Sequence, residues 1–102
     1  MNIKLNKVSI ERFSRQIVLK DVGIIGQKKI ISSKVLVVGA GGLGSPVTEF
    51  LSRAGVGIIG IVDNDKVSLS NLHRQCLYNN SDIGKFKVKI AKKNIKKINT
   101  ST

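Results

Sequence analysis

Residues 35–45, which read VLVVGAGGLGS, carry three glycines in the spacing G-x-G-x-x-G, at positions Gly39, Gly41 and Gly44. Because glycine has no Cβ atom, such a loop turns tightly and lets its backbone approach a phosphate closely. A helix that follows the loop points free N–H groups and a partial positive charge at the anion. The pattern therefore predicts a nucleotide site. It suits a redox dinucleotide as well as ATP, and glycines that serve only helix–strand packing are the structural alternative.

Polar residues further along the chain favour a triphosphate. Asp63 follows the next apolar run, about 20 residues after the glycines, where an acid commonly accepts hydrogen bonds from ribose hydroxyls. It opens the segment DNDKVSLSNLHRQ, and DIGKFKVK follows a little later. Arg74 and Lys87 in these segments can neutralise phosphate oxygens, and Asn71 and Gln75 can add hydrogen bonds. A redox dinucleotide has no use for such a cluster, so we expect ATP.

Apolar spacing predicts the elements that position these residues. We expect helices over residues 9–18 and 24–31, then strands over 34–38 and 58–62 that are buried on both faces of a parallel sheet. Between the strands lies a helix that ends at Gly55, and residues 85–98 form a last helix. The order of strand, glycine loop, helix and strand predicts a βαβ unit.

Each of the two later helices has an apolar stripe that is predicted to face the core. The stripe of the helix between the strands consists of Leu43, Val47, Phe50, Leu51 and Ala54. That of the last helix consists of Val88, Ala91, Ile95 and Ile98, with lysines covering its other side.

Composition bounds the class of protein. The chain of 102 residues is long enough for one domain and has no apolar run of membrane-spanning length. Its net charge of +12 invites a nucleic-acid interpretation, but seven lysines fall within residues 85–97. We interpret them first as a solvated face in a lysine-rich composition, and next as a docking surface for an acidic partner. Cys76, the single cysteine, fits a reducing compartment such as the cytoplasm and is predicted to be a buried filler rather than a nucleophile.

Taken together, five segments resemble the start of the ThiF/MoeB/HesA family, the bacterial relatives of ubiquitin-activating enzymes. They are RFSRQIVL, GQKKI, SKVLVVGAGGLGSP, AGVGIIGIVDNDKVSLSNLHRQ and DIGKFKV, between Arg12 and Ile98. The pattern D-x-D-x-V-x-x-S-N-L-x-R-Q is the most specific part. The resemblance implies an α/β fold, with a Rossmann-like βαβ nucleotide-binding unit preceded by N-terminal helices. Residues 1–33 would form the helical segment, and residues 34–98 the βαβ core with its following helix.

The resemblance also implies an activity. Such enzymes are adenylyltransferases that activate the C-terminal glycine of a ubiquitin-like sulfur-carrier protein, ThiS/MoaD-like, in thiamine or molybdopterin biosynthesis. The glycine carboxylate attacks the α-phosphate of ATP, accompanied by Mg²⁺, and gives an acyl adenylate and pyrophosphate. A homodimer is implied, zinc belongs to a later part of the family's sequence, and neither a membrane nor nucleic acid is an expected partner.

Site residues carry over by position. Catalytic roles fall to Arg74, Lys87 and Arg15, the last reaching the ATP of the other subunit. Nucleotide binding falls to Gly39, Gly41, Gly42, Gly44, Asp63, Asp65, Ser70, Asn71, Leu72, His73, Arg74 and Lys87. Asp65 is expected more as a cap of the following turn than as a direct ligand.

Family members are more than twice as long as this chain. We therefore expect residues 1–102 to be the N-terminal part of a ThiF-type ATP-binding domain, an incomplete doubly wound parallel sheet that is not catalytically competent by itself. Two strands would leave apolar faces and both sheet edges open. The alternatives from other classes are a fragment of a Rossmann NAD(P) oxidoreductase and a small basic nucleic-acid-binding protein.

Overall fold

The computed structural model describes residues 3–102, which form an incomplete Rossmann-like α/β unit. Its elements follow the order predicted for a βαβ unit with preceding helices. They are α1 (Lys7–Arg12), α2 (Ser14–Ile17), α3 (Gly23–Ile31), β1 (Lys34–Val38), α4 (Gly44–Ala54), β2 (Ile58–Val62), the 3₁₀ turns η1 (Leu69–Asn71) and η2 (Asn80–Asp82), and α5 (Lys87–Ile98).

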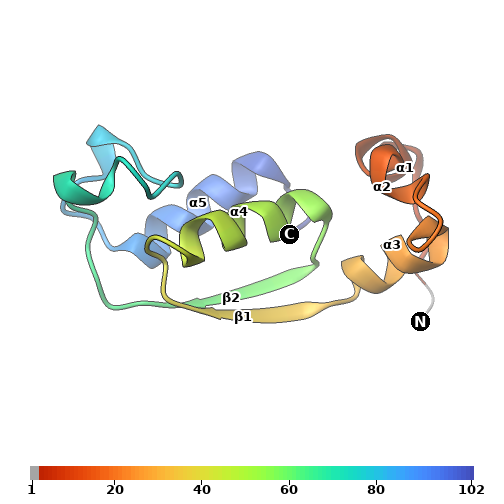
Figure 1. The fold of residues 1–102 in the computed structure, drawn as a ribbon, viewed down its shortest axis with the longest axis horizontal. Helices are drawn as coiled ribbons and strands as arrows, with labels where there is room; N and C mark the ends of the chain where they lie inside the picture. Colours follow the sequence, from red (N-terminus) through yellow and green to blue (C-terminus); the bar gives the residue numbers. More distant parts are fainter. Residues whose placement is uncertain (1–2) are drawn as a thin grey trace.

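The two strands pair in parallel, with Lys34 opposite Ile58 and Val38 opposite Val62. Helix α4 makes the crossover between them. Figure 1 shows α4 and α5 together on one side of the strands, while α1, α2 and α3 lie beyond the end at which β1 begins. The glycine turn after β1 and the segment after β2 lie at the opposite, carboxyl end of the sheet. That end is where ligands bind in open α/β sheets.

The predicted bounds of both strands are confirmed, but their burial on both faces is wrong. The side chains of Leu36 and Val38 are 65% and 78% exposed, and Ile58 and Val62 are exposed as well. Helices cover only one face of this sheet, so the alternate side chains on the other face meet solvent. The open apolar face expected of a two-stranded parallel sheet is therefore present in the described chain.

The predicted inward face of α4 is also wrong in large part. Leu43, Val47 and Phe50 are exposed, and the residues that α4 buries are Ser45, Thr48 and Ser52. Helix α4 packs against β1 and α5. Ser45 and Ser52 also form hydrogen bonds with segments that are distant in the sequence. The Ser45 hydroxyl accepts a hydrogen bond from the Leu77 amide (3.1 Å), and the Ser52 carbonyl accepts one from the Asn99 side chain (3.0 Å).

The helix predicted over residues 9–18 is divided at Phe13 into α1 and α2. The buried Phe13 ring lies against Gly55, where a Cβ atom would come within 2.7 Å of the ring. Gly55 ends α4 with φ of 103°, a left-handed conformation that favours glycine. The side-chain amides of Gln16 and Gln27 both donate to the carbonyl of Ala54, at 3.1 and 3.0 Å. The N-terminal helices are thus fastened to the end of α4.

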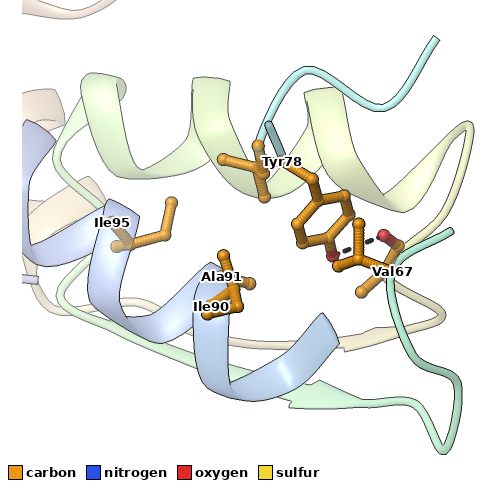
Figure 2. Packing of buried hydrophobic residues seen from close by; sticks show 7 residues of the cluster. Val67, Tyr78, Ile90, Ala91 and Ile95 are labelled. Atoms are coloured by element: carbon orange, nitrogen blue, oxygen red, sulfur yellow. Dashed lines mark hydrogen bonds between the residues drawn. The ribbon is translucent and has the colours of Figure 1, made fainter. Parts of the chain in front are cut away.

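The core lies between α5 and the segment that follows β2. Figure 2 shows Tyr78 and Val67 above the inward face of α5, which presents Ile90, Ala91 and Ile95. The apolar stripe predicted for the last helix is confirmed at Ala91 and Ile95, which are buried, and at Ile98, which packs against the core cluster. Val88 is only half-buried, and the inward face includes Ile90, which the prediction omitted. The helix begins at Lys87 rather than at residue 85. Within residues 3–102, no helix combines the length and the apolar character that a membrane span requires.

Candidate functional site

The glycine turn joins the end of β1 to the start of α4. Gly39 has φ of 99° and donates its amide to the carbonyl of Val62 (2.7 Å). At Gly44, a Cβ atom would lie 1.7 Å from the Gly39 carbonyl oxygen. The turn thus requires glycine at position 39 because of the positive φ angle, and at position 44 because a side chain would not fit. Gly41 and Gly42 have room for a methyl group.

The carboxylate of Asp63 joins this turn to the end of β2. One of its oxygens accepts a hydrogen bond from the Ala40 amide and the other accepts one from the Asp65 amide, each at 2.7 Å. Asp63 therefore braces the turn, a role that the sequence did not indicate. Each carboxylate oxygen can accept a further hydrogen bond, so the residue can still receive a ribose hydroxyl.

These contacts set the ionisation of Asp63. Burial opposes the charged form, but the amides of Ala40 and Asp65 and the charge of Lys87 outweigh it, so the pKa of Asp63 is lowered from 3.8. A lowered folded-state pKa means that the unfolded chain takes up the proton first as the pH falls. The carboxylate therefore stabilises the fold above its ordinary pKa, and this contribution is lost as the pH falls through the folded-state value.

We expect Asp63→Asn to be less stable than the wild type at neutral pH, with the difference shrinking at about pH 3. Thermal unfolding followed by circular dichroism at both pH values measures this. The matched control is Asp21→Asn, which changes an exposed acid outside the site. A stability difference for Asp63→Asn that is the same at both pH values would contradict a role of its charge.

Lys87 is buried, with 5% of its surface exposed, while the other six lysines of residues 85–97 are exposed. It opens α5, where a cation is disfavoured by the helix dipole. Its ammonium lies 4.0 Å from an Asp65 carboxylate oxygen, and its amide donates to the Asp65 carbonyl. Asp65 thus holds the start of α5 through its backbone carbonyl and its carboxylate. The arrangement keeps one desolvated positive charge beside the braced turn.

Arg74 and Gln75 reach the glycine turn from the segment after β2. The Cβ position of Gly42 is 3.6 Å from the Arg74 Nε atom, and that of Gly41 is 3.5 Å from the Gln75 side-chain nitrogen. Arg74 is exposed and donates to the Ser70 carbonyl at 3.3 Å. Gln75 is 2% exposed, and its side-chain oxygen Oε1 is buried with no hydrogen-bond partner among the described residues. The two predicted motifs therefore meet in the folded chain.

The other predicted polar residues of this segment form hydrogen bonds with neighbours in the same segment. The Ser68 hydroxyl donates to the Asn71 side chain (2.8 Å), and His73 Nδ1 lies 3.1 Å from the Ser70 carbonyl. The side chain of Leu72 packs against the core cluster, so it stabilises the fold rather than contacting a ligand.

The fold does not place Arg15 at the nucleotide site of its own protomer. It is exposed on α2, at the end of the molecule opposite the glycine turn. A role in the same protomer is therefore excluded by position, and its reach into another subunit stays a prediction.

Two residues of the site region differ from what the sequence indicated. Tyr78 was not foreseen: its hydroxyl donates to the Ala40 carbonyl at 2.6 Å, and burial, followed by nearby carboxylates and thiol, raises its pKa well above the ordinary value. Cys76, predicted to be buried, is exposed because Leu77 and Tyr78 take the inward positions. Desolvation and the Glu49 carboxylate, to which the thiol donates at 3.1 Å, raise the pKa of Cys76 and disfavour a thiolate nucleophile.

Comparison with known proteins gives one family throughout. The sequence model of the ThiF family matches residues 13–102. The chain is 50% identical, over 95% of its length, to adenylyltransferase and sulfurtransferase MOCS3 of Culex quinquefasciatus, of which it covers 22%. It is 45% identical to a probable molybdopterin-synthase adenylyltransferase of Gracilaria tenuistipitata var. liui, over 96% of the chain and 28% of that protein. It is 44% identical to the sulfur carrier protein adenylyltransferase of Thermus thermophilus, over 95% of the chain and 36% of that protein.

Solved structures show the same fold as this chain. The E. coli tRNA N6-threonylcarbamoyladenosine dehydratase TcdA in complex with ATP superposes with a TM-score of 0.88 and 28% identity, over 97% of this chain and 40% of that one. E. coli MccB with AMPCPP and MccA superposes with a TM-score of 0.82 and 31% identity, over 98% of this chain and 29% of that one. The chain thus spans between about a fifth and two fifths of the length of these proteins.

Proposed function

The chain belongs to the ThiF family, and from this we propose that it forms the nucleotide-binding start of an ATP-dependent adenylyltransferase. Residues 1–102 would then be the N-terminal part of a ThiF-type ATP-binding domain. The main support for the proposal is that two positively charged side chains lie at or near the glycine turn. Arg74 lies against Gly42, and the buried Lys87 lies close enough to Asp63 to lower its pKa. A triphosphate needs such cations more than a redox dinucleotide does.

The proposed roles follow from position. The glycine turn and the N-terminus of α4 offer backbone N–H groups to phosphate oxygens, since the first amides of a helix have no partner within it. Arg74 and Lys87 supply the charges that stabilise the α-phosphate when a carboxylate attacks it and pyrophosphate leaves. Asp63 orients the ribose while it braces the turn. Ser70, Asn71 and His73 supply polar groups next to Arg74. The chemistry is mostly positioning and charge stabilisation.

The proposed acyl substrate is a protein carboxylate. One relative is named a sulfur carrier protein adenylyltransferase, and MccB was solved with MccA. Together with the sequence resemblance, these names support the C-terminal glycine of a ubiquitin-like sulfur carrier as the group that is adenylated. We further propose a homodimer in which Arg15 serves the neighbouring subunit. Because the single cysteine fits a reducing compartment, we place the protein in the cytoplasm.

Mg²⁺ accompanies ATP in this chemistry, but the described residues do not form a site for it. Residues 3–102 hold no group of three or more Asp, Glu, His or Cys side chains that could bind a metal. Both oxygens of Asp63 already accept backbone amides, and the charge of Asp65 faces Lys87. We therefore assign no residue of this chain to Mg²⁺ and none to zinc.

Isothermal titration calorimetry with ATP and with NAD⁺ tests the choice of nucleotide. We expect ATP to bind and NAD⁺ to bind more weakly, because Arg74 and Lys87 complement a triphosphate. The control is Arg53→Ala, which removes an exposed arginine on α4 that pairs with Glu49 outside the site. NAD⁺ binding that is tighter than ATP binding would reverse the proposal in favour of an oxidoreductase.

A further inference from the structure

The carbonyl of Ala54, at the end of α4, accepts hydrogen bonds from two side chains of the N-terminal helices. The side-chain nitrogen of Gln16 donates to it at 3.1 Å and that of Gln27 at 3.0 Å. The Gln16 nitrogen also donates to the side-chain oxygen of Gln27 at 2.7 Å. These three groups, which we call the glutamine lock, join α2, α3 and α4, and none of the surface of Gln27 is exposed.

The lock supplies a partner that the end of α4 lacks. The last carbonyls of a helix have no partner within it, and a buried carbonyl needs one. The amides of Gly55 and Val56 donate to earlier carbonyls of α4, and the carbonyl of Ala54 is served by the two glutamines. Because each glutamine is bonded both to this carbonyl and to the other glutamine, the directions of both side chains are fixed.

Helix α2 depends on contacts with other elements for its orientation. It has four residues, which make about one turn, and a single turn is unstable by itself because nucleating a helix is costly. None of its own residues is fully buried. The contacts that hold it are the buried Phe13 ring, which precedes it and lies against Gly55, and the hydrogen bonds of Gln16 within it.

Arg15 is the residue that Gln16 can orient most directly. Successive residues of a helix point about 100° apart, so a Gln16 side chain that is held at Ala54 sets the side of α2 from which Arg15 projects. On that side Arg15 is exposed. In Figure 1, α2 lies at the end of the molecule opposite the glycine turn, so this side chain is available to a neighbouring molecule.

We propose that the glutamine lock positions Arg15 for the nucleotide of the neighbouring subunit, an inference that rests on the proposed role of Arg15. Gln16 and Gln27 are then positioning residues, which hold α2 so that the guanidinium group need not be ordered when the nucleotide binds. The lock also gives a role to the glutamines of the segments RFSRQIVL and GQKKI, which lie outside the nucleotide site.

A double-mutant cycle with ATP titration tests whether Gln16 acts through Arg15. Gln16→Met keeps the length and charge of the side chain but cannot donate to Ala54. We expect Arg15→Ala to weaken ATP binding by about tenfold or more, and Gln16→Met by about threefold or more because Arg15 is no longer preorganised. The double variant is expected to match Arg15→Ala within about twofold. Each protein is titrated calorimetrically at a concentration at which sedimentation shows a dimer.

The matched control is Asn6→Ala, which removes the cap of the neighbouring helix α1. The Asn6 side chain accepts a hydrogen bond from the Ser9 amide at 2.8 Å and takes no part in the lock. We expect this variant to be less stable and to keep the wild-type affinity for ATP. Equal weakening by Asn6→Ala and Gln16→Met, or additive losses in the double variant, would show a general structural effect and contradict positioning.

The remaining outcomes separate this proposal from the proposed function. An unchanged affinity of Arg15→Ala, or a protein that does not dimerise, would refute the role of Arg15 in a neighbouring subunit and the positioning proposal with it. A loss with Arg15→Ala but none with Gln16→Met would leave the role of Arg15 standing and refute the lock alone.

Hydrogen exchange tests the lock without any nucleotide. The amides of Ile17 and Val18 donate to the carbonyls of Phe13 and Ser14, so their protection reports the turn that carries Arg15. We expect Gln16→Met to lose protection at these two amides and to keep it throughout α5. Unchanged protection of both amides would show that the lock does not hold α2 and would overturn the proposal.

Discussion

Replacing Gly44 by alanine is expected to lower the free energy of unfolding by about 3 kcal/mol, at the upper end of the cost of overpacking. The added Cβ atom would lie 1.7 Å from the carbonyl oxygen of Gly39. Backbone cannot move aside as a flexible side chain can, so α4 must shift away from the end of β1. Chemical denaturation of the variant and the wild type, followed by circular dichroism, measures the change.

Gly41→Ala is the matched control for this substitution. Its Cβ atom would meet nothing closer than the Gln75 side chain at 3.5 Å, which is an ordinary contact, and Gly41 does not have a positive φ. We expect its unfolding free energy to stay the same or rise by about 0.4–1 kcal/mol, because alanine restricts the unfolded chain. Equal destabilisation by the two substitutions would mean that the close approach at Gly44 is not what the turn requires.

Replacing Arg74 by alanine is expected to weaken ATP binding by about 1.5–3 kcal/mol, the range for a hydrogen bond to a charged group. The guanidinium group of Arg74 lies beside the glycine turn and its side chain is exposed, so its removal leaves the core intact. Calorimetric titration with ATP measures the loss, which corresponds to a factor of about 10–150 in the dissociation constant.

Two variants make this result specific. Arg74→Lys keeps a positive charge but loses the planar fork, so we expect an affinity between those of the wild type and Arg74→Ala. Arg53→Ala removes an equally charged side chain from the exposed pair with Glu49 and is expected to leave ATP binding unchanged. An unchanged affinity of Arg74→Ala, with the fold intact, would place Arg74 outside the phosphate site.

Local features of the sequence determined the elements and their order. Both strands were predicted with their observed bounds, because a short β-branched run between glycines and polar residues has few alternatives. Gly55 ends α4 because its left-handed conformation suits glycine best. The sequence assigned the glycine turn and the segment from Asp63 to Gln75 to one nucleotide site, and the folded chain brings them into contact at the carboxyl ends of the two parallel strands.

Only the tertiary structure decided which faces are buried and how the charged side chains are held. The apolar stripe of α4 predicted the wrong inward face, because the available neighbours accept the small residues Ser45 and Thr48 and leave Phe50 exposed. The sequence motif singled out Lys87 among seven lysines, but only the folded chain shows that it is buried, with its ammonium 4.0 Å from the Asp65 carboxylate. The bond from Tyr78 to Ala40 joins residues far apart in the chain. Periodicity and motifs report local conformation, whereas burial depends on which distant segments arrive, and that is set by packing of the whole chain.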